Sequence, residues 1–122
     1  MNNKNIPRSF KYAIQGFRIA LLNEFKIRLH CAIVVIVVTG GFLLNLSILE
    51  WISVVISMGM VLITELINTS IETLSDTLHP DVSEGIKNTK DIAASAVLIA
   101  STTALIIGLI VFIPYLCQYI KI

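Results

Sequence analysis

The sequence reads TELINTSIETLSD at residues 64–76, and this segment continues a long apolar, uncharged run. An α-helix turns about 100° per residue, so Glu72 and Asp76 each lie within about 20° of Glu65 around the axis. Asn68 lies about 60° from Glu65 on the same side. A carboxylate at the centre of a bilayer costs about 2.5–3.5 kcal/mol to insert, so a helix face with three of them is by default a functional site. We call this set of four residues the acidic face.

The composition indicates one membrane domain. Of the 122 residues, 56% are hydrophobic and 14% are charged, which is too apolar for a soluble fold of this size. The formal net charge is +1, so bulk electrostatics predicts no nucleic-acid partner. We therefore expect a single, all-α integral membrane domain over residues 1–122.

An amphipathic helix is predicted at residues 5–28. Apolar side chains recur there every three or four residues from Ile6 to Phe25, while Arg8 and Lys11 face another way. A basic amphipathic helix ahead of a membrane span is typical of a helix that lies in the membrane interface. A helix of a soluble bundle has the same pattern, but it fits poorly with so apolar a chain. We therefore predict an N-terminal surface helix.

Three transmembrane helices are predicted after it. Residues 29–49 carry no charge and are long enough to cross about 30 Å of hydrocarbon. A second span, at about 50–74, carries the acidic face. A loop with Pro and Gly at residues 78–85 precedes the third span, at about 90–118.

The two ends of the third helix have their own signals. Asn88 with Asp91 three residues later forms a loose capping box, which predicts a helix that starts near Asn88. Pro114 is expected to kink or end the helix near its exit from the membrane.

The basic residues predict the orientation of the chain. Six of the nine precede the first span, two (Lys87 and Lys90) lie in or next to the second loop, and the first loop has none. By the positive-inside rule, the surface helix and the loop at residues 77–90 are cytoplasmic and the C-terminus is outside. Glu65 then lies about 10 Å deeper in the membrane than Glu72.

A stripe of small residues, Ala96, Ala100, Ala104 and Gly108, repeats every four positions along the third span. Such a stripe lets another helix approach closely. Three spans bury little surface on their own, so one interpretation is a contact between subunits. A contact within one chain is the other interpretation, and the sequence leaves both open.

Carboxylates and lysines gathered at one membrane surface can support phosphoryl transfer. Mg²⁺ prefers oxygen ligands and is commonly held by one or two carboxylates plus a nucleotide. Lys90, placed at a helix N-terminus, suits a phosphate, and the deeper Glu65 can accept a proton from an alcohol in the bilayer. Intramembrane carboxylates also serve in ion pathways and subunit interfaces. Spacing therefore leaves three classes open: a lipid kinase, a small multimeric proton or cation conductor, and a structural subunit.

The acidic face also carries a resemblance to a known family. Residues 65–76, ELINTSIETLSD, resemble the signature E-x-x-N-[ST]-x-I-E-x-x-x-D of the prokaryotic diacylglycerol kinases, which include the undecaprenol kinases. Residues 90–97, KDIAASAV, resemble that family's K-D-x-x-[AS]-[AG]-A-V, and residues 9–13, 16–18 and 23–28 also fit. The resemblance covers essentially the whole chain.

The resemblance implies roles for individual residues. Glu65 matches the general base that takes the proton of the lipid hydroxyl, and Asn68 matches a polar position of the same lipid site. Glu24 and Glu72 match the pair that binds the divalent metal, expected to be Mg²⁺. The nucleotide contacts it implies are Tyr12, Glu24, Glu72, Asp76, Asp81, Lys90 and Asp91.

Several of these residues have simpler interpretations. Glu24 can be a surface charge paired with Arg28 four residues later. Tyr12 can be an interfacial anchor, and Asp76 can simply meet water at the helix end.

The resemblance further implies a homotrimer with active sites shared between subunits, in the inner membrane of a bacterium. The N-terminus and the active site are expected in the cytoplasm, with ATP as the phosphoryl donor. The expected reaction converts diacylglycerol to phosphatidic acid. Undecaprenol, giving undecaprenyl phosphate, is the alternative, because both lipids offer a primary hydroxyl near the headgroup plane.

Overall fold

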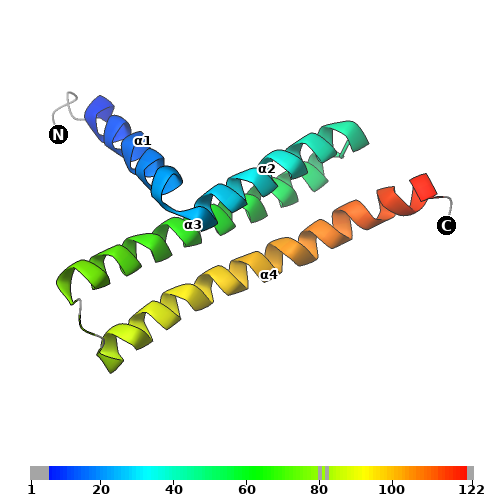
Figure 1. The fold of residues 1–122 in the computed structure, drawn as a ribbon. Helices are drawn as coiled ribbons and strands as arrows, with labels where there is room; N and C mark the ends of the chain where they lie inside the picture. Colours follow the sequence, from blue (N-terminus) through cyan, green and yellow to red (C-terminus); the bar gives the residue numbers. More distant parts are fainter. Residues whose placement is uncertain (1–5, 80, 82, 121–122) are drawn as a thin grey trace.

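The computed structural model describes residues 6–79, 81 and 83–120, and in this part of the chain it contains four helices. These are α1 (Ile6–Asn23), α2 (Phe25–Leu44), α3 (Ile48–Leu78) and α4 (Glu84–Ile120). Figure 1 shows α3 and α4 as a long antiparallel pair, with α2 along the first part of α3. Helices α2, α3 and α4 are long and apolar enough to cross a membrane. The predicted all-α membrane architecture is confirmed.

The surface helix ends earlier than predicted. Helix α1 stops at Asn23 rather than at residue 28, because Glu24 has an extended backbone, with φ −108° and ψ 117°. The Arg28 guanidinium donates a hydrogen bond of 2.8 Å to the carbonyl of Leu22 and so caps the last turn of α1. Helix α2 therefore begins at Phe25 rather than at residue 29, and α1 leaves it at an angle (Figure 1).

The turn between α2 and α3 is set by two local caps. Asn45 adopts the left-handed conformation, with φ 54° and ψ 53°, which ends α2 at Leu44 rather than at residue 49. Ser47 and Glu50 form a reciprocal capping box, so α3 starts at Ile48 rather than at residue 50.

The second loop is shorter than predicted because both helices that flank it are longer. Helix α3 continues past residue 74 to Leu78. Helix α4 starts at Glu84 rather than near residue 90. Its first turn is capped by Ser83, whose carbonyl accepts from the Lys87 amide at 3.0 Å and whose hydroxyl accepts from the Ile86 amide at 3.3 Å.

The two end signals predicted for the third span were therefore wrong in part. Asn88 lies inside α4 and caps nothing, because Ser83 provides the cap one turn earlier. Pro114 also lies inside the helix, which continues through it to Ile120 rather than ending there.

Few residues are buried between the helices of this chain. At most 28% of the most apolar window of any of the three spans is buried, as expected for helices that face lipid or another subunit. A small apolar cluster of Leu46, Val54 and Val111 joins α3 to α4 next to the first turn. Gly41 allows the α2–α3 contact, since a Cβ there would lie 2.7 Å from the Trp51 ring.

The small-residue stripe faces partly into the same chain. Ala100 is buried, and Ala104 and Gly108 border a cavity shared with α2 and α3. Gly108 does not permit a close helix approach here, because a Cβ at that position would meet nothing within 4 Å. Only Ala100 therefore supports the interpretation of a contact within one chain, and Ala96 is exposed.

Candidate active site

The deep half of the acidic face is buried. Glu65 is 1% exposed and Asn68 is 2% exposed, and both side chains project from the middle of α3. Glu65 Oε1 and Asn68 Oδ1 are buried atoms with no hydrogen-bond partner among the described residues. Buried polar atoms are almost always paired, so these two oxygens mark a place prepared for a further group.

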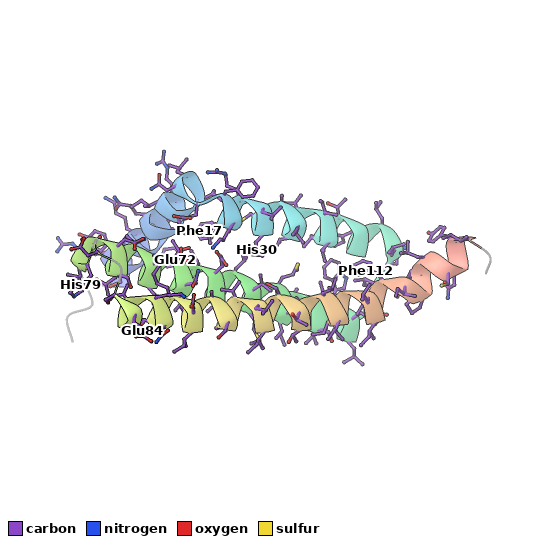
Figure 2. All side chains as sticks on the ribbon, turned by 60° about the horizontal axis from the view of Figure 1, so that its bottom comes forward. Phe17, His30, Glu72, His79, Glu84 and Phe112 are labelled. Atoms are coloured by element: carbon purple, nitrogen blue, oxygen red, sulfur yellow. The ribbon has the colours of Figure 1, made fainter. Side chains whose placement is uncertain are left out.

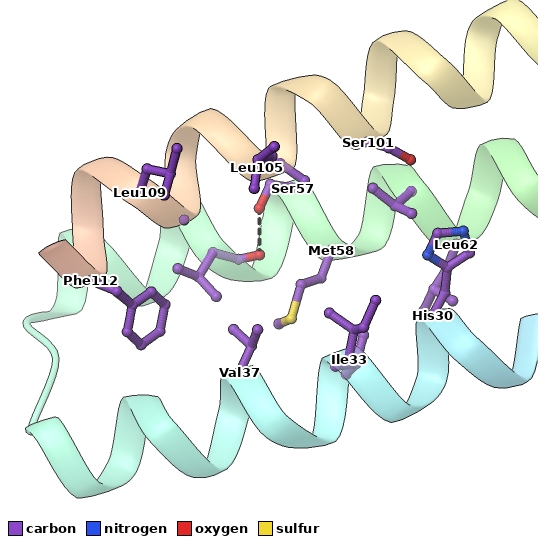
Figure 3. Close-up of a pocket in the computed structure, with 15 residues that line it drawn as sticks. His30, Ile33, Val37, Ser57, Met58, Leu62, Ser101, Leu105, Leu109 and Phe112 are labelled. Carbon is purple, nitrogen blue, oxygen red and sulfur yellow. Dashed lines mark hydrogen bonds between the residues drawn. The ribbon is translucent and has the colours of Figure 1, made fainter.

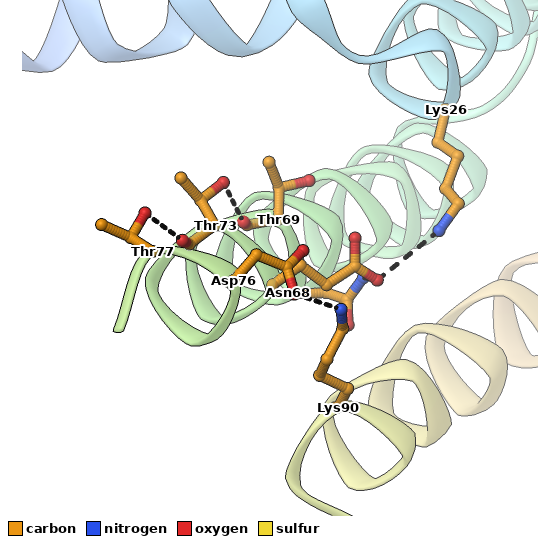
Figure 4. Close-up of polar contacts among 8 residues, drawn as sticks. Lys26, Asn68, Thr69, Thr73, Asp76, Thr77 and Lys90 are labelled. Carbon is orange, nitrogen blue, oxygen red and sulfur yellow. Dashed lines mark hydrogen bonds and ion pairs between the residues drawn. The ribbon is translucent and has the colours of Figure 1, made fainter. Parts of the chain in front are cut away.

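The shallow half of the acidic face makes contacts with the other helices. Asn68 Nδ2 donates a hydrogen bond of 3.0 Å to Glu72 Oε1, one turn along α3. The same oxygen lies 3.8 Å from Lys26 Nζ, at the start of α2. One turn further, Asp76 Oδ1 accepts a hydrogen bond of 2.8 Å from Lys90 Nζ on α4. Figure 4 shows the two lysines reaching toward α3 from different helices.

A surface groove of about 200 Å³ lies beside this half, at the α3–α4 end of the molecule. Figure 2 places His79 and Glu84 at that end and Glu72 on the side of α3 that faces α1 and the start of α2. The groove is lined by Asp76, His79, Asp81, Ile86, Lys87, Lys90 and Asp91. The structure thus brings together four of the residues predicted to contact the nucleotide. Lys90 lies in the second turn of α4 rather than at its N-terminus, because the helix starts at Glu84.

The other predicted residues stand apart from the groove. Glu24 occupies the break between α1 and α2, two residues before Lys26, and is half-buried. The described residues contain no ion pair between Glu24 and Arg28, whose guanidinium caps α1 instead. Tyr12 is 67% exposed on α1, and no hydrogen bond among the described residues joins it to the acidic face.

The donor set on the acidic face fits a magnesium ion that arrives with a nucleotide. Among the described residues, no three His, Cys, Asp or Glu side chains are grouped so that they could hold a metal by themselves. Mg²⁺ needs fewer, since it keeps several waters and is commonly held by one or two carboxylates plus phosphate oxygens. Glu72 is suitable because its side chain is 31% exposed and its Oε2 takes part in no hydrogen bond or ion pair among the described residues.

An apolar cavity of about 320 Å³ lies deeper, between α2, α3 and α4 (Figure 3). Val61 and Leu62 line it, and Val61 is one turn from Glu65 on the same face of α3. His30 and Ser101 are among its few polar lining residues, and the Ser57 hydroxyl is satisfied by the carbonyl of Val54 at 2.9 Å. An apolar chain attached to an alcohol near Glu65 would find a matching environment here.

Sequence reasoning missed Lys26, His79 and Lys87. Lys26 on α2 forms an ion pair with Glu72 on α3, and no helical periodicity links residues so far apart in the chain. Its one available signal was its position next to Glu24 at the membrane surface. His79 and Lys87 were assigned to the loop and to the orientation of the chain, whereas the structure places both on the wall of the groove.

The site as a whole changes from buried to exposed along one helix. The buried Glu65 carboxylate, with one oxygen unpaired among the described residues, lies in the middle of α3. A second carboxylate lies about two turns nearer the end of that helix, and a groove with lysines opens beyond it. Such an arrangement can hold a proton acceptor beside a lipid alcohol and a polyphosphate beside the lysines.

Known proteins resemble this chain in sequence over most of its length. Residues 11–112 match the family described as prokaryotic diacylglycerol kinase. The chain is 35% identical to an undecaprenol kinase of Bacillus subtilis over 109 residues, which cover 89% of each chain. It is 34% identical to a diacylglycerol kinase of Synechocystis over 90% of this chain and 63% of that one. A diacylglycerol kinase of Escherichia coli is 29% identical over 83% of each chain.

Proposed function

This chain belongs to the prokaryotic diacylglycerol kinase family and is a lipid kinase, and we propose that it transfers the terminal phosphate of ATP to the primary hydroxyl of diacylglycerol. Family membership favours this reaction over the ion conductor and the structural subunit that residue spacing left open. The product of the proposed reaction is phosphatidic acid.

The observation that carries the proposal is the buried Glu65 carboxylate, whose Oε1 has no partner among the described residues. In the proposed mechanism Glu65 removes the proton from the lipid hydroxyl as the hydroxyl oxygen attacks the terminal phosphorus of ATP, and the bond from that phosphorus to the bridging oxygen breaks to release ADP. Asn68 lies beside it and orients the hydroxyl. Exclusion of water at this depth keeps the phosphate from being lost to hydrolysis.

The nucleotide is proposed to bind in the surface groove. Asp76, Asp81, Lys90 and Asp91 are proposed to contact the nucleotide, with Lys90 near the terminal phosphates. Tyr12 is proposed to contact it from α1. Catalysis would then come mainly from positioning the phosphate in line with the alcohol.

A magnesium ion is proposed to accompany ATP, held by Glu72 and Glu24. When bound, it would neutralise the charge that develops on the phosphate oxygens. Glu72 presents its carboxylate between the buried base and the groove, which is where the nucleotide and the alcohol would have to meet.

Undecaprenol is the second candidate substrate. The similarity to the undecaprenol kinase of Bacillus subtilis, over 89% of each chain, favours it. The proposed catalytic residues act on the hydroxyl alone and serve either lipid.

We also propose that the protein is a homotrimer in a bacterial inner membrane, with the N-terminus and the active site in the cytoplasm. The excess of basic residues before the first span and at the second loop supports this orientation. The largely unburied apolar faces of the three spans support association with further helices.

A lipid phosphorylation assay tests the proposal. Purified protein in mixed micelles receives labelled ATP, Mg²⁺ and either diacylglycerol or undecaprenol, and labelled lipid is counted after extraction. We expect phosphatidic acid to form faster than undecaprenyl phosphate, and we expect Glu65→Gln to lower the rate by about 10²–10⁴-fold. Faster labelling of undecaprenol would assign the second substrate, and ion flux in vesicles without any lipid labelling would overturn the kinase mechanism.

A further inference from the structure

The charges around Glu72 suggest a role for a residue outside the proposed catalytic set. Lys26 Nζ lies 3.8 Å from Glu72 Oε1, the oxygen that also accepts the hydrogen bond from Asn68. The ammonium therefore forms an ion pair with the carboxylate that the proposed function assigns to the divalent metal. A divalent metal bound to the other oxygen of this carboxylate would lie within a few ångströms of the ammonium, and the two positive charges would repel each other.

Lys26 is free to move away from this carboxylate. Its side chain is 58% exposed, and its only ion pair among the described residues is the one with Glu72. A lysine carries its charge on a flexible four-carbon stem, so its ammonium can swing several ångströms without moving the backbone.

A second lysine stands in a matching arrangement one turn along α3. Lys90 pairs with Asp76 from α4, whereas Lys26 pairs with Glu72 from α2 (Figure 4). The two ammonium groups thus approach the acidic face from different helices, and the space between them is bounded by carboxylates. A polyphosphate entering with its metal would meet a cation on each side.

We propose that Lys26 is an exchangeable positioning residue for the kinase reaction. While the metal is absent, its ammonium pairs with the Glu72 carboxylate. When the divalent metal binds that carboxylate, the ammonium moves away and binds the phosphate oxygens of the nucleotide. This inference rests on the proposed function, because it needs Glu72 to be a metal ligand.

Metal binding without nucleotide provides a readout that is independent of activity. The full-length protein in detergent is titrated with Mn²⁺, and free Mn²⁺ is followed by electron paramagnetic resonance. Lys26→Gln removes the competing cation, so we expect Mn²⁺ to bind about fivefold more tightly. Lys26→Arg should keep the native affinity, and Lys11→Gln, an exposed substitution on α1, should leave it unchanged.

Steady-state kinetics test the second half of the exchange. In Lys26→Gln we expect the KM for MgATP to rise about fivefold while the KM for the lipid stays the same. Lys26→Arg should restore the KM for MgATP. A merely structural role would move both KM values together and would weaken Mn²⁺ binding rather than strengthen it, which would overturn the inference.

Glu72→Gln separates this inference from the proposed function. If that variant loses Mn²⁺ binding while Lys26→Gln binds Mn²⁺ as the native protein does, the role of Lys26 is wrong and the metal site stands. If Glu72→Gln still binds Mn²⁺ with native affinity, the proposed metal site fails and the inference fails with it.

Discussion

Asn68 donates a hydrogen bond of 3.0 Å from Nδ2 to Oε1 of Glu72, and this contact joins the buried half of the acidic face to its exposed half. The amide oxygen of Asn68 is buried and has no hydrogen-bond partner in the described part of the chain, and the same holds for Oε1 of Glu65. Asn68 thus stands between the proposed base and the proposed metal ligand.

Glu65→Gln should lower the rate of lipid phosphorylation by about 10²–10⁴-fold, because the amide cannot accept the proton of the alcohol. The substitution keeps the shape of the side chain, so the thermal unfolding temperature in detergent should not fall. The rate is measured with labelled ATP and extracted lipid. Glu84→Gln, an exposed change on α4, is the matched control, and equal losses in both variants would rule out Glu65 as the base.

Asn68→Ala should reduce metal affinity or activity by about 10–100-fold, the usual effect of removing a hydrogen bond that orients a metal ligand. The Mg²⁺ concentration at half-maximal activity measures this effect. Ser70→Ala removes a hydroxyl that donates to the carbonyl of Leu66 in its own helix, and it should leave the Mg²⁺ dependence unchanged. An unchanged Mg²⁺ dependence in Asn68→Ala would mean that the contact with Glu72 does not orient the ligand.

Lys90→Gln should raise the KM for ATP about tenfold by removing one charge-assisted contact to phosphate. Its ion pair with Asp76 lies at the surface, with side chains 32% and 65% accessible, so its loss should change stability little. Initial rates at varied ATP give the KM, and chemical unfolding gives the stability. Arg18→Gln on the exposed side of α1 is the control. A large loss of stability with an unchanged KM would assign Lys90 a structural role.

Gly41→Ala should destabilise the fold by about 1–3 kcal/mol, because the new Cβ would lie 2.7 Å and 2.9 Å from two atoms of the Trp51 ring. Unfolding in detergent, followed by Trp51 fluorescence, measures the change. Gly59→Ala is matched, since a Cβ there meets nothing within 4 Å, and it should be neutral or stabilising by up to about 1 kcal/mol. Equal stability of both variants would contradict the close approach of α2 and α3.

Tyr115→Phe should lower the stability of the fold by removing the hydrogen bond of 2.8 Å that the phenol donates to Glu50 Oε2. The same oxygen accepts from the Ser47 hydroxyl at 2.7 Å, so this contact ties α4 to the cap of α3. Tyr119→Phe, on a residue that is 73% exposed, should change nothing. A double-mutant cycle with Glu50→Gln isolates the pair, and a coupling energy near zero would show that the contact is not formed in the membrane.

Local patterns in the sequence were enough to predict the helical class, the three spans and the acidic face. Each of these depends on the spacing of residues within one helix, which the backbone geometry fixes wherever a helix forms. The helix ends were less predictable, because several nearby residues can cap the same helix end and the sequence does not show which of them does. Ser83 and not Asn88 begins α4, and Arg28 caps α1 instead of pairing with Glu24.

The contacts between helices required the packed chain. Lys26 meets Glu72, Lys90 meets Asp76, and Tyr115 meets Glu50 across 65 positions of sequence. Such pairs depend on how each helix is rotated and shifted against its neighbour, and that is set by side-chain packing along the whole seam rather than by any local period. For the same reason the acidic face was visible in one segment of sequence, whereas the lysines that flank it became identifiable only once α2, α3 and α4 were assembled.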